Sequence, residues 1–280
     1  AALLIVLKPV VFGTGYERLV GGTIMSSVHI NQNGPVLIVT IDRPQARNAV
    51  DGPTAKALYD AFKEFDSDDS ARVAILTGAD GNFCAGADLK AVAAGGGNRV
   101  EVEGDFGPMG PSRLELSKPV IAAVDGYAVA GGIELAAWCD LRVVSPSAKF
   151  GVFCRRFGVP LIDGGTIRLP RLIGASRAMD MILTGREVGA EEALAIGLAN
   201  YKTDEETALA KAMNVAEHIA AFPQLCMQKD RLSALRQWSL DLPDALRAET
   251  EGGLEVLRAG SAVEGASRFT SGQGRGGALD

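Results

Sequence analysis

The apolar segment Val120–Val124 runs into a glycine-containing turn, and an Ala- and Leu-rich helical pattern begins at Ile133. A short apolar run bounded by a turn predicts a buried strand. Gly131 and Gly132 then lie at the helix N-terminus, where unpaired backbone N–H groups and the helix dipole favour a negatively charged oxygen. Glu134 follows within the first turn. This order predicts an α/β fold, and the acid beside the turn indicates acid/base chemistry on a carbonyl compound.

A second stretch of the chain repeats this order. Residues 72–77, Arg-Val-Ala-Ile-Leu-Thr, are nearly all apolar, as in a strand that helices cover on both faces. Residues 82–90, Asn-Phe-Cys-Ala-Gly-Ala-Asp-Leu-Lys, then form a small-residue turn that leads into a helix. Two such turns on neighbouring strands can each direct one backbone N–H at the same oxygen. That geometry is an oxyanion hole for a carbonyl group.

Strands and helices alternate in the first half of the chain, and the second half is mostly helical. Val36–Ile41 is rich in β-branched residues and predicts a strand, and Asp51 can cap the helix that follows. Residues 94–111 contain too many glycines and prolines for regular structure and predict a flexible lid or a disordered loop. Thr203-Asp-Glu-Glu206 has the form of a capping box, which predicts a helix start.

These patterns divide the chain into four parts. Met25 precedes a clean strand pattern, which favours it as the natural start and residues 1–24 as an N-terminal extension that is not native. An α/β core then spans residues 25–205 and a helical C-terminal region spans residues 206–270. The glycine-rich tail of residues 271–280 is predicted to be flexible.

Composition excludes several classes of function. A net charge of −6 in 280 residues argues against a nucleic-acid surface, and the apolar start is interrupted by Lys8 and Pro9 well before a membrane-spanning length of roughly 20 residues. The cysteines are widely spaced with no C-x-x-C pair, which favours a reduced cytoplasmic protein. Two histidines leave little material for a zinc site or a Ser-His-Asp triad.

Four motifs together resemble the enoyl-CoA hydratase/isomerase family, also called the crotonase superfamily. The resemblance covers residues 36–269, and its motifs are Asp42-Arg-Pro with Ala46-Arg-Asn48, Phe83-Cys-Ala-Gly-Ala-Asp-Leu-Lys90, Lys118-Pro-Val-Ile-Ala-Ala-Val-Asp-Gly-Tyr-Ala128 with Gly131-Gly-Ile-Glu-Leu-Ala136, and Gly164-Gly-Thr166 with Leu169-Pro-Arg-Leu-Ile-Gly174. The resemblance implies a ClpP-like spiral of ββα turns that forms two roughly perpendicular sheets. It also implies C-terminal helices that assemble a homotrimer or a dimer of trimers.

The family binds acyl-CoA thioesters and stabilises an enolate or a tetrahedral oxyanion with two backbone N–H groups. By motif position these belong to Ala87 and Gly131. The segment that lines the path of CoA and its thioester comprises Ala85, Ala87, Asp88, Leu89 and Lys90, and Ala46 lies where family members contact the adenine. Coenzyme A is therefore expected as part of the substrate, with no permanently bound cofactor and no metal.

Hydratases of this family place two glutamates around a water molecule. Glu134 matches the first, but Cys154 stands where the second is expected, in Phe150-Gly-Val-Phe-Cys154. Three interpretations of Cys154 remain open. It is a buried packing thiol, an active-site residue with altered chemistry, or a redox-sensitive thiol whose pKa is lowered by Arg155 and Arg156.

Asp163 is the other carboxylate in range of the expected site. It lies close to a position where isomerases of the family carry a catalytic aspartate, and it can also cap the helix that starts at Gly164. The sequence thus predicts an enoyl-CoA hydratase-like enzyme with Glu134, Asp163 and Cys154 as candidate catalytic residues. An enoyl-CoA isomerase, an acyl-CoA thioester hydrolase and a non-catalytic acyl-CoA-binding protein are the alternatives.

Overall fold

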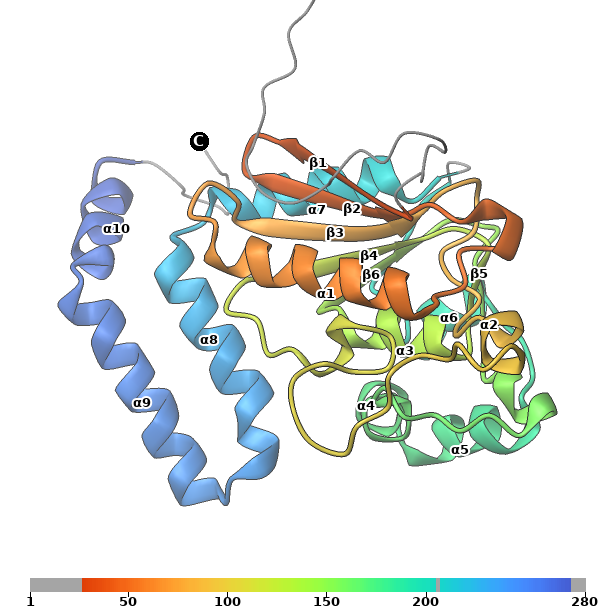
Figure 1. Cartoon of the computed structure of the whole chain (residues 1–280). Helices are drawn as coiled ribbons and strands as arrows, with labels where there is room; N and C mark the ends of the chain where they lie inside the picture. Colours follow the sequence, from red (N-terminus) through yellow and green to blue (C-terminus); the bar gives the residue numbers. More distant parts are fainter. Residues whose placement is uncertain (1–26, 205–206, 273–280) are drawn as a thin grey trace, which may run out of the picture.

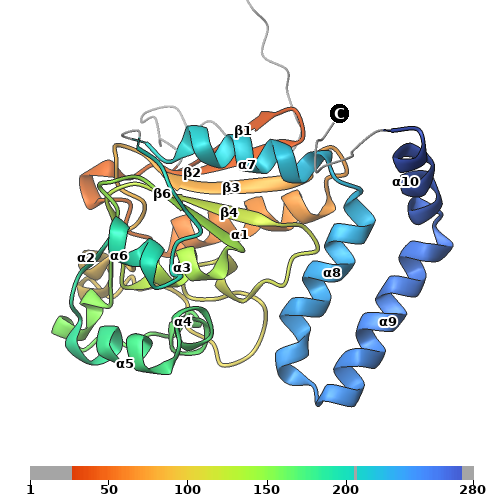
Figure 2. The ribbon, with the colours of Figure 1, turned by 180° about the vertical axis from the view of Figure 1, so that it is seen from behind.

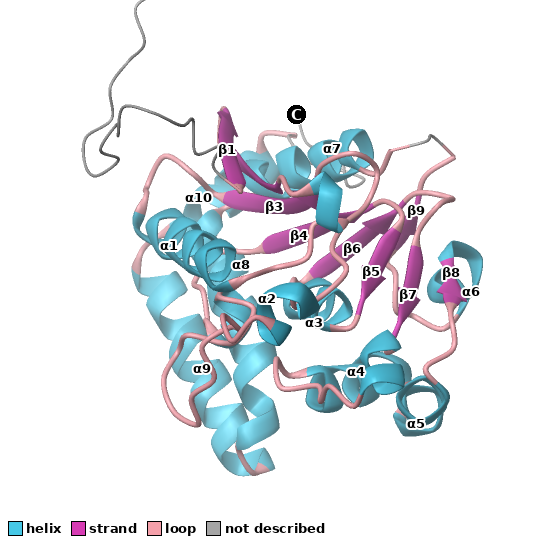
Figure 3. Ribbon diagram, turned by 45° about the vertical axis from the view of Figure 1, so that its right-hand side comes forward, coloured by secondary structure: helices cyan, strands magenta, loops and turns pink. Residues whose placement is uncertain are grey.

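Two β-sheets form the centre of the fold in the computed structural model, which describes residues 27–204 and 207–272. The six strands of the larger sheet lie in the order β1 (Val28–Asn33), β2 (Val36–Ile41), β3 (Val73–Gly78), β4 (Val120–Val124), β6 (Leu141–Val144) and β9 (Tyr201–Lys202). The smaller sheet contains β5 (Tyr127–Val129), β7 (Lys149–Gly151) and β8 (Val188–Gly189). Figure 3 shows both sheets with their surrounding helices. The predicted α/β class is confirmed.

Parallel pairing in the larger sheet determines where the loops gather. β1 and β2 are antiparallel, whereas β2, β3, β4, β6 and β9 run parallel. The carboxyl ends of parallel strands meet at one edge of a sheet, where ligands of open α/β folds bind. The turns that follow β3 and β4 therefore lie near each other, as the sequence predicts.

Helices cover both faces of the larger sheet. α1 (Gly52–Ser67) lies across one face and α7 (Leu209–Ala221) across the other (Figures 1 and 2). Every residue of β4 is buried, which explains why its sequence is continuously apolar rather than alternating. One buried cluster joins α7 to β3, β4 and β6, and a larger cluster joins the opposite face to α1 and to α3 (Gly131–Trp138).

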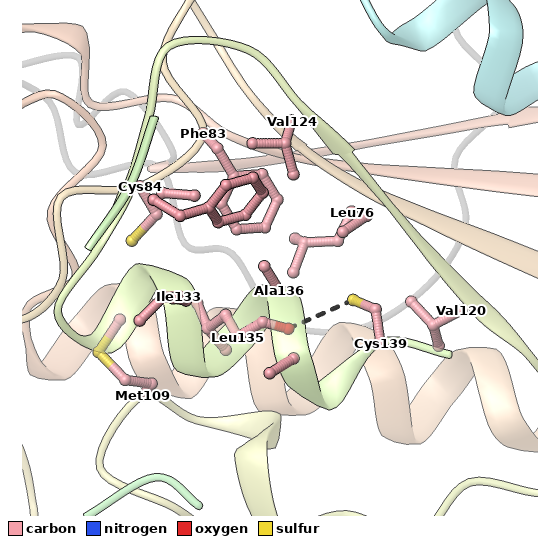
Figure 4. Close-up of a cluster of buried hydrophobic side chains, with 14 of the residues drawn as sticks. Leu76, Phe83, Cys84, Met109, Val120, Val124, Ile133, Leu135, Ala136 and Cys139 are labelled. Atoms are coloured by element: carbon pink, nitrogen blue, oxygen red, sulfur yellow. Dashed lines mark hydrogen bonds between the residues drawn. The ribbon is translucent and has the colours of Figure 1, made fainter. Parts of the chain in front are cut away.

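The larger buried cluster fixes α3 beneath the sheet. Figure 4 shows Ile133 and Leu135 of α3 beside Phe83 and Leu76, with Met109 at the start of the helix. All five side chains are buried. Burial of a large apolar side chain stabilises a fold by roughly 1.5–3 kcal/mol, so this packing holds the N-terminus of α3 firmly in place.

Two of the predicted helix caps, at Asp51 and Thr203, have different outcomes. The Asp51 side chain accepts a hydrogen bond from the Thr54 amide, which confirms the predicted start of α1. The prediction that Thr203 opens a helix is wrong, because its amide continues the β6–β9 pairing and α7 begins only at Leu209. The last two residues of that predicted capping box lie outside the described residues. The Asp125 carboxylate accepts the hydrogen bond of the Ala208 amide instead.

The remaining helices follow the predicted helical second half of the chain. They are α2 (Leu89–Ala93), α4 (Gly165–Ile173), α5 (Ala175–Thr184), α6 (Ala190–Ala195), α8 (Gln224–Arg236), α9 (Leu242–Arg258) and α10 (Ser261–Thr270). Four short 3-10 turns, η1 (Pro44–Ala46), η2 (Pro111–Arg113), η3 (Phe153–Phe157) and η4 (Gln237–Ser239), complete the regular structure described. α8 and α9 form a hairpin that extends away from the sheets (Figure 1).

The predicted boundary at residues 205–206 stays a prediction. The proposed extension of residues 1–24 and most of the predicted tail lie outside the described residues. None of the helices within residues 27–204 and 207–272 combines the length and the apolar composition of a membrane span.

Candidate active site

The two small-residue turns predicted from the sequence are in direct contact. The structure adds one strand that the sequence does not predict, β5, between β4 and α3. Gly86 has φ +94°, and a Cβ atom built there would lie 2.9 Å from the Gly131 nitrogen. A Cβ on Gly132 would lie 2.0 Å from the carbonyl oxygen of Cys84. Only glycine allows the two backbones to approach this closely.

Each turn presents one backbone amide without a partner. The amide of Val50 donates to Gly86 O at 2.8 Å and the amide of Asp88 donates to Val50 O at 3.0 Å, so the intervening Ala87 N–H faces away from this pairing. Gly131 is the first residue of α3, where an amide has no partner within the helix. Neither amide donates a hydrogen bond among residues 27–204 and 207–272.

A cavity of about 270 Å³ opens beside these two amides. Ala87, Gly131, Glu134, Cys154 and Asp163 all line it, so the structure brings together both predicted oxyanion-hole residues and all three candidate catalytic residues. The rest of its wall is mostly apolar and includes Leu89, Val92, Val100, Phe153, Phe157, Val159 and Ile162. An apolar wall with a few converging polar groups is typical of a substrate site.

Glu134 is buried at the base of the cavity and is 2% exposed. Its Oε1 atom accepts hydrogen bonds from the amides of Asp163 at 2.9 Å and Gly165 at 2.8 Å, at the N-terminus of α4. Burial raises the pKa of Glu134 to about 7, and the negative charge of Asp163 raises it as well. The two amide hydrogen bonds lower the pKa and offset part of this effect. A carboxyl group with such a pKa can both take and give a proton near neutral pH.

Asp163 is also buried, and its carboxylate binds a neighbouring loop. Oδ1 accepts hydrogen bonds from the Met109 amide at 2.9 Å and from the Ser112 hydroxyl. Burial raises the pKa of Asp163, and the Ser112 hydrogen bond opposes that shift. The prediction that Asp163 caps a helix is wrong, because Gly164 in a left-handed conformation occupies the N-cap of α4 without any side-chain cap.

Cys154 lies in η3 with 5% of its surface exposed. Burial raises the pKa of its thiol, and the charge of Glu134 raises it further. The Arg155 and Arg156 guanidinium groups donate to backbone oxygens of Ile182 and Gly185. The expectation that Arg155 and Arg156 lower the pKa of Cys154 is therefore wrong, and its role as a packing, active-site or redox-sensitive thiol stays a prediction.

The predicted CoA segment divides into two groups. Ala85, Ala87 and Leu89 line the cavity, whereas Asp88, Lys90 and Ala46 do not. The Asp88 carboxylate caps α2 and forms an ion pair with Arg43 at 2.9 Å, which gives it a structural contact that the motif does not reveal.

Three residues that the sequence does not predict hold the site together. The side chain of Met109 covers Gly131, because a Cβ on that glycine would lie 2.7 Å from its Sδ atom. Ser112 binds Asp163, and Arg168 donates to the carbonyl oxygens of both Ser112 and Asp163, each at 2.8 Å. The end of the predicted flexible loop, residues 107–111, is buried, and residues 94–110 contain no helix or strand, as predicted. Coordinates are needed to reveal the contacts of Ser112, since Asp163 and Arg168 lie more than 50 residues away from it in the chain.

Comparison with known proteins agrees with this geometry. Residues 31–270 match the sequence model of the family described as Enoyl-CoA hydratase/isomerase. The chain is 36% identical to enoyl-CoA hydratase EchA19 of Mycobacterium tuberculosis over 247 residues, which are 86% of this chain and 92% of the relative. It is 41% identical to carnitinyl-CoA dehydratase of Salmonella typhi over 198 residues, or 69% of this chain and 74% of the relative.

The fold is similar to that of a solved family member. The crystal structure of enoyl-CoA hydratase EchA1 from Mycobacterium marinum matches with a TM-score of 0.83 and 36% identity, over 88% of this chain and 96% of that one. The predicted crotonase fold is confirmed by this similarity. With the family match over residues 31–270 and relatives that align along most of their length, the chain belongs to the enoyl-CoA hydratase/isomerase family.

Proposed function

We propose that this protein is an acyl-CoA-processing enzyme that adds water reversibly to a 2-enoyl-CoA thioester. One observation supports the proposal most strongly. The same apolar cavity contains two unpartnered backbone amides, Ala87 and Gly131, and a buried carboxyl group, Glu134, whose pKa is raised to about 7. An acid/base group next to two fixed N–H donors matches what hydration of a conjugated thioester requires.

The two amides act on the thioester carbonyl. Its oxygen accepts hydrogen bonds from Ala87 N–H and Gly131 N–H, which draw electron density from the conjugated double bond toward that oxygen. As water adds, negative charge develops on the same oxygen and the two bonds strengthen. In other enzymes the loss of one such donor costs roughly 3–4 kcal/mol of transition-state stabilisation.

The two carboxyl groups handle the protons. The Glu134 carboxylate takes a proton from water as the water oxygen bonds to the β-carbon, and the π electron pair moves into the thioester to form an enolate. Asp163 in its protonated form delivers a proton to the α-carbon, and the enolate returns to a thioester. The Cys154 thiol stays protonated and packs beside the substrate.

The CoA portion of the substrate extends from the cavity along the predicted segment. In this proposal Ala85 and Leu89 contact the thioester arm, while Asp88, Lys90 and Ala46 lie further along the path toward the adenine. Coenzyme A is the only organic group required, and it enters and leaves with the substrate. Cytoplasmic location and the absence of nucleic-acid and membrane partners stay predictions from composition.

We further propose a homotrimer or a dimer of trimers that assembles through the helical C-terminal region. Large apolar side chains on α9 and α10 support it, since Leu242 is 71% exposed and Val263 is 69% exposed. Exposed apolar residues grouped on neighbouring helices are typical of subunit contacts. Sedimentation analysis tests this proposal, and a monomer at micromolar concentration contradicts it.

Loss of the conjugated-thioester absorbance of crotonyl-CoA tests the hydration proposal. We expect turnover by the native protein and little by Glu134→Gln, whose amide oxygen can still accept the hydrogen bonds of Asp163 and Gly165. Equal, background-level rates in both proteins contradict hydration.

Enoyl-CoA isomerisation is the second candidate, favoured by the cysteine at position 154 and by Glu134 as the one glutamate among the described residues that line the cavity. Conversion of a 3-enoyl-CoA to the conjugated isomer, without hydration of crotonyl-CoA, supports that alternative. Release of free CoA thiol indicates a thioester hydrolase. Tight acyl-CoA binding with none of these reactions indicates a binding protein.

A further inference from the structure

The side chain of Arg168 joins the segment that contains Asp163 to the segment that contains Ser112. Arg168 lies in the first turn of α4, and its guanidinium group folds back toward the start of the helix. One terminal nitrogen donates to Asp163 O at 2.8 Å, and the other donates to Ser112 O at 2.8 Å. These two residues lie on separate segments, so Arg168 connects the loop before α4 with η2.

Gly164 makes this position available. It has φ +94°, and a Cβ atom built there would lie 2.3 Å from a terminal nitrogen of Arg168. A side chain at position 164 would therefore displace the guanidinium group as well as strain the backbone. Gly164 thus leaves space for the Arg168 guanidinium group and also forms the N-cap of α4.

The same two segments are also joined through the side chain of Asp163. There the Asp163 carboxylate accepts hydrogen bonds from the Ser112 hydroxyl and the Met109 amide, and the Met109 side chain covers Gly131. Arg168 and the Asp163 carboxylate therefore hold the same two segments together through different atoms. A shift of either contact would move Asp163 relative to the amide of Gly131.

No carboxylate forms an ion pair with Arg168 among the residues that the structure describes. A buried charge without a close partner is costly unless other groups compensate it. The ionisable groups that face it are Glu134 of α3, Asp163, Cys139 at the end of α3 and Arg171 of its own helix. Its positive charge lowers the pKa of both cavity carboxyl groups, against the larger effect of their burial.

We infer that Arg168 is a positioning residue for the proposed acid/base pair, which holds Asp163 against the Ser112 segment. This inference rests on the proposed function. Arg168 acts through Asp163 and Glu134 and does not line the catalytic cavity itself.

Three variants test the inference in the full-length chain. Arg168→Met removes the charge and both hydrogen bonds while keeping much of the side-chain length. Arg168→Lys keeps the positive charge, but the lysine ammonium group lacks the planar pair of terminal nitrogens with which arginine donates to both oxygens. Arg171→Met is the matched control, because this arginine lies on the same helix and its guanidinium group stacks on Trp238 instead.

The readouts are kcat and KM for crotonyl-CoA, the pH profile of kcat/KM, and the thermal unfolding midpoint. We expect Arg168→Met to lower kcat about 30-fold with KM changed less than about 3-fold, and to move the acidic limb of the profile to higher pH. Arg168→Lys should keep the limb near its native pH and recover only part of kcat. Arg171→Met should leave both properties unchanged.

Other outcomes overturn the inference and can be distinguished from failure of the proposed function. Native kcat with a native acidic limb in Arg168→Met contradicts it, and so does an equal loss of kcat in Arg171→Met. If Arg168→Met does not fold, a displaced acidic limb in Arg168→Lys contradicts the role of the charge. If native protein turns over crotonyl-CoA no faster than Glu134→Gln, the proposed function itself has failed.

Discussion

The amide wall and the carboxylate wall of the cavity are held in place by different kinds of contact. Ala87 and Gly131, the amide wall, lie on two turns whose backbones touch through Gly86 and Gly132. Glu134 and Asp163, the carboxylate wall, are positioned by hydrogen bonds between segments far apart in the chain. The amide wall therefore depends on glycines, which have no side chain. The carboxylate wall depends on several specific polar side chains.

This difference separates the part of the chemistry that is general from the part that selects a reaction. Two fixed amides stabilise charge on a thioester oxygen whichever reaction follows. In the proposed mechanism, the carboxyl groups decide where protons move. Variants of the two walls should therefore fail in different ways.

Glu134→Gln tests the carboxylate wall and should have the largest effect on catalysis. The glutamine can still accept the two amide hydrogen bonds but cannot take a proton from water. We expect kcat for crotonyl-CoA hydration to fall about 10³-fold, with the unfolding midpoint nearly unchanged. A loss smaller than about 10-fold would assign the proton transfer to another group.

Gly132→Ala tests the amide wall through stability. The new Cβ would lie 2.0 Å from the backbone oxygen of Cys84, which cannot move without displacing the turn. We expect a loss of about 3 kcal/mol in the free energy of unfolding, measured by denaturant titration. Gly52→Ala is the matched control, since its Cβ would meet nothing closer than 4.0 Å. Equal stability of the two variants would contradict the tight packing of the turns.

The pH dependence of kcat/KM tests the environment of the carboxylate wall. Burial raises the pKa of Glu134 to about 7, and the deprotonated form is the base, so activity is lost as pH falls below that value. At pH 5 we expect kcat/KM to be about 100-fold below its plateau, from the protonated fraction alone. A fall of kcat/KM that occurs only near pH 4 would mean that the Glu134 carboxyl group is exposed to solvent in the working enzyme.

Ser112→Ala tests the joint between the Asp163 carboxylate and its loop. The change removes one donor and leaves the Met109 amide as the remaining partner of that oxygen. We expect kcat to fall about 10-fold, because the loss of a buried hydrogen bond costs roughly 1–3 kcal/mol. The pKa of Asp163 should rise further. Ser67→Ala, at the exposed end of α1, should have native activity.

Cys154→Ala should have the smallest effect. Its thiol stays protonated and makes no proton transfer in the proposed mechanism, so we expect kcat to change less than about 3-fold, with a loss of roughly 1 kcal/mol in stability. A 100-fold fall in kcat would favour Cys154 as an active-site residue with altered chemistry. A gain of hydration in Cys154→Glu would show that this position limits the native rate.

The amide wall was predictable from the sequence and much of the carboxylate wall was not. Gly131 and Ala87 follow apolar strands in small-residue turns, and backbone contact leaves few alternatives to glycine at such places. The Asp51 cap was predictable because it is local. Asp163 and Thr203 were misassigned as helix caps because their true partners, Ser112 and Val144, lie far away in the sequence. Met109 and Arg168 give no local signal at all.

The most direct test of the central claim is a crystal structure of Glu134→Gln with bound crotonyl-CoA. The two walls predict that the thioester oxygen lies about 2.7–3.1 Å from both Ala87 N and Gly131 N, with the β-carbon facing position 134. A thioester oxygen bonded to neither amide, or a β-carbon directed away from position 134, would contradict the account.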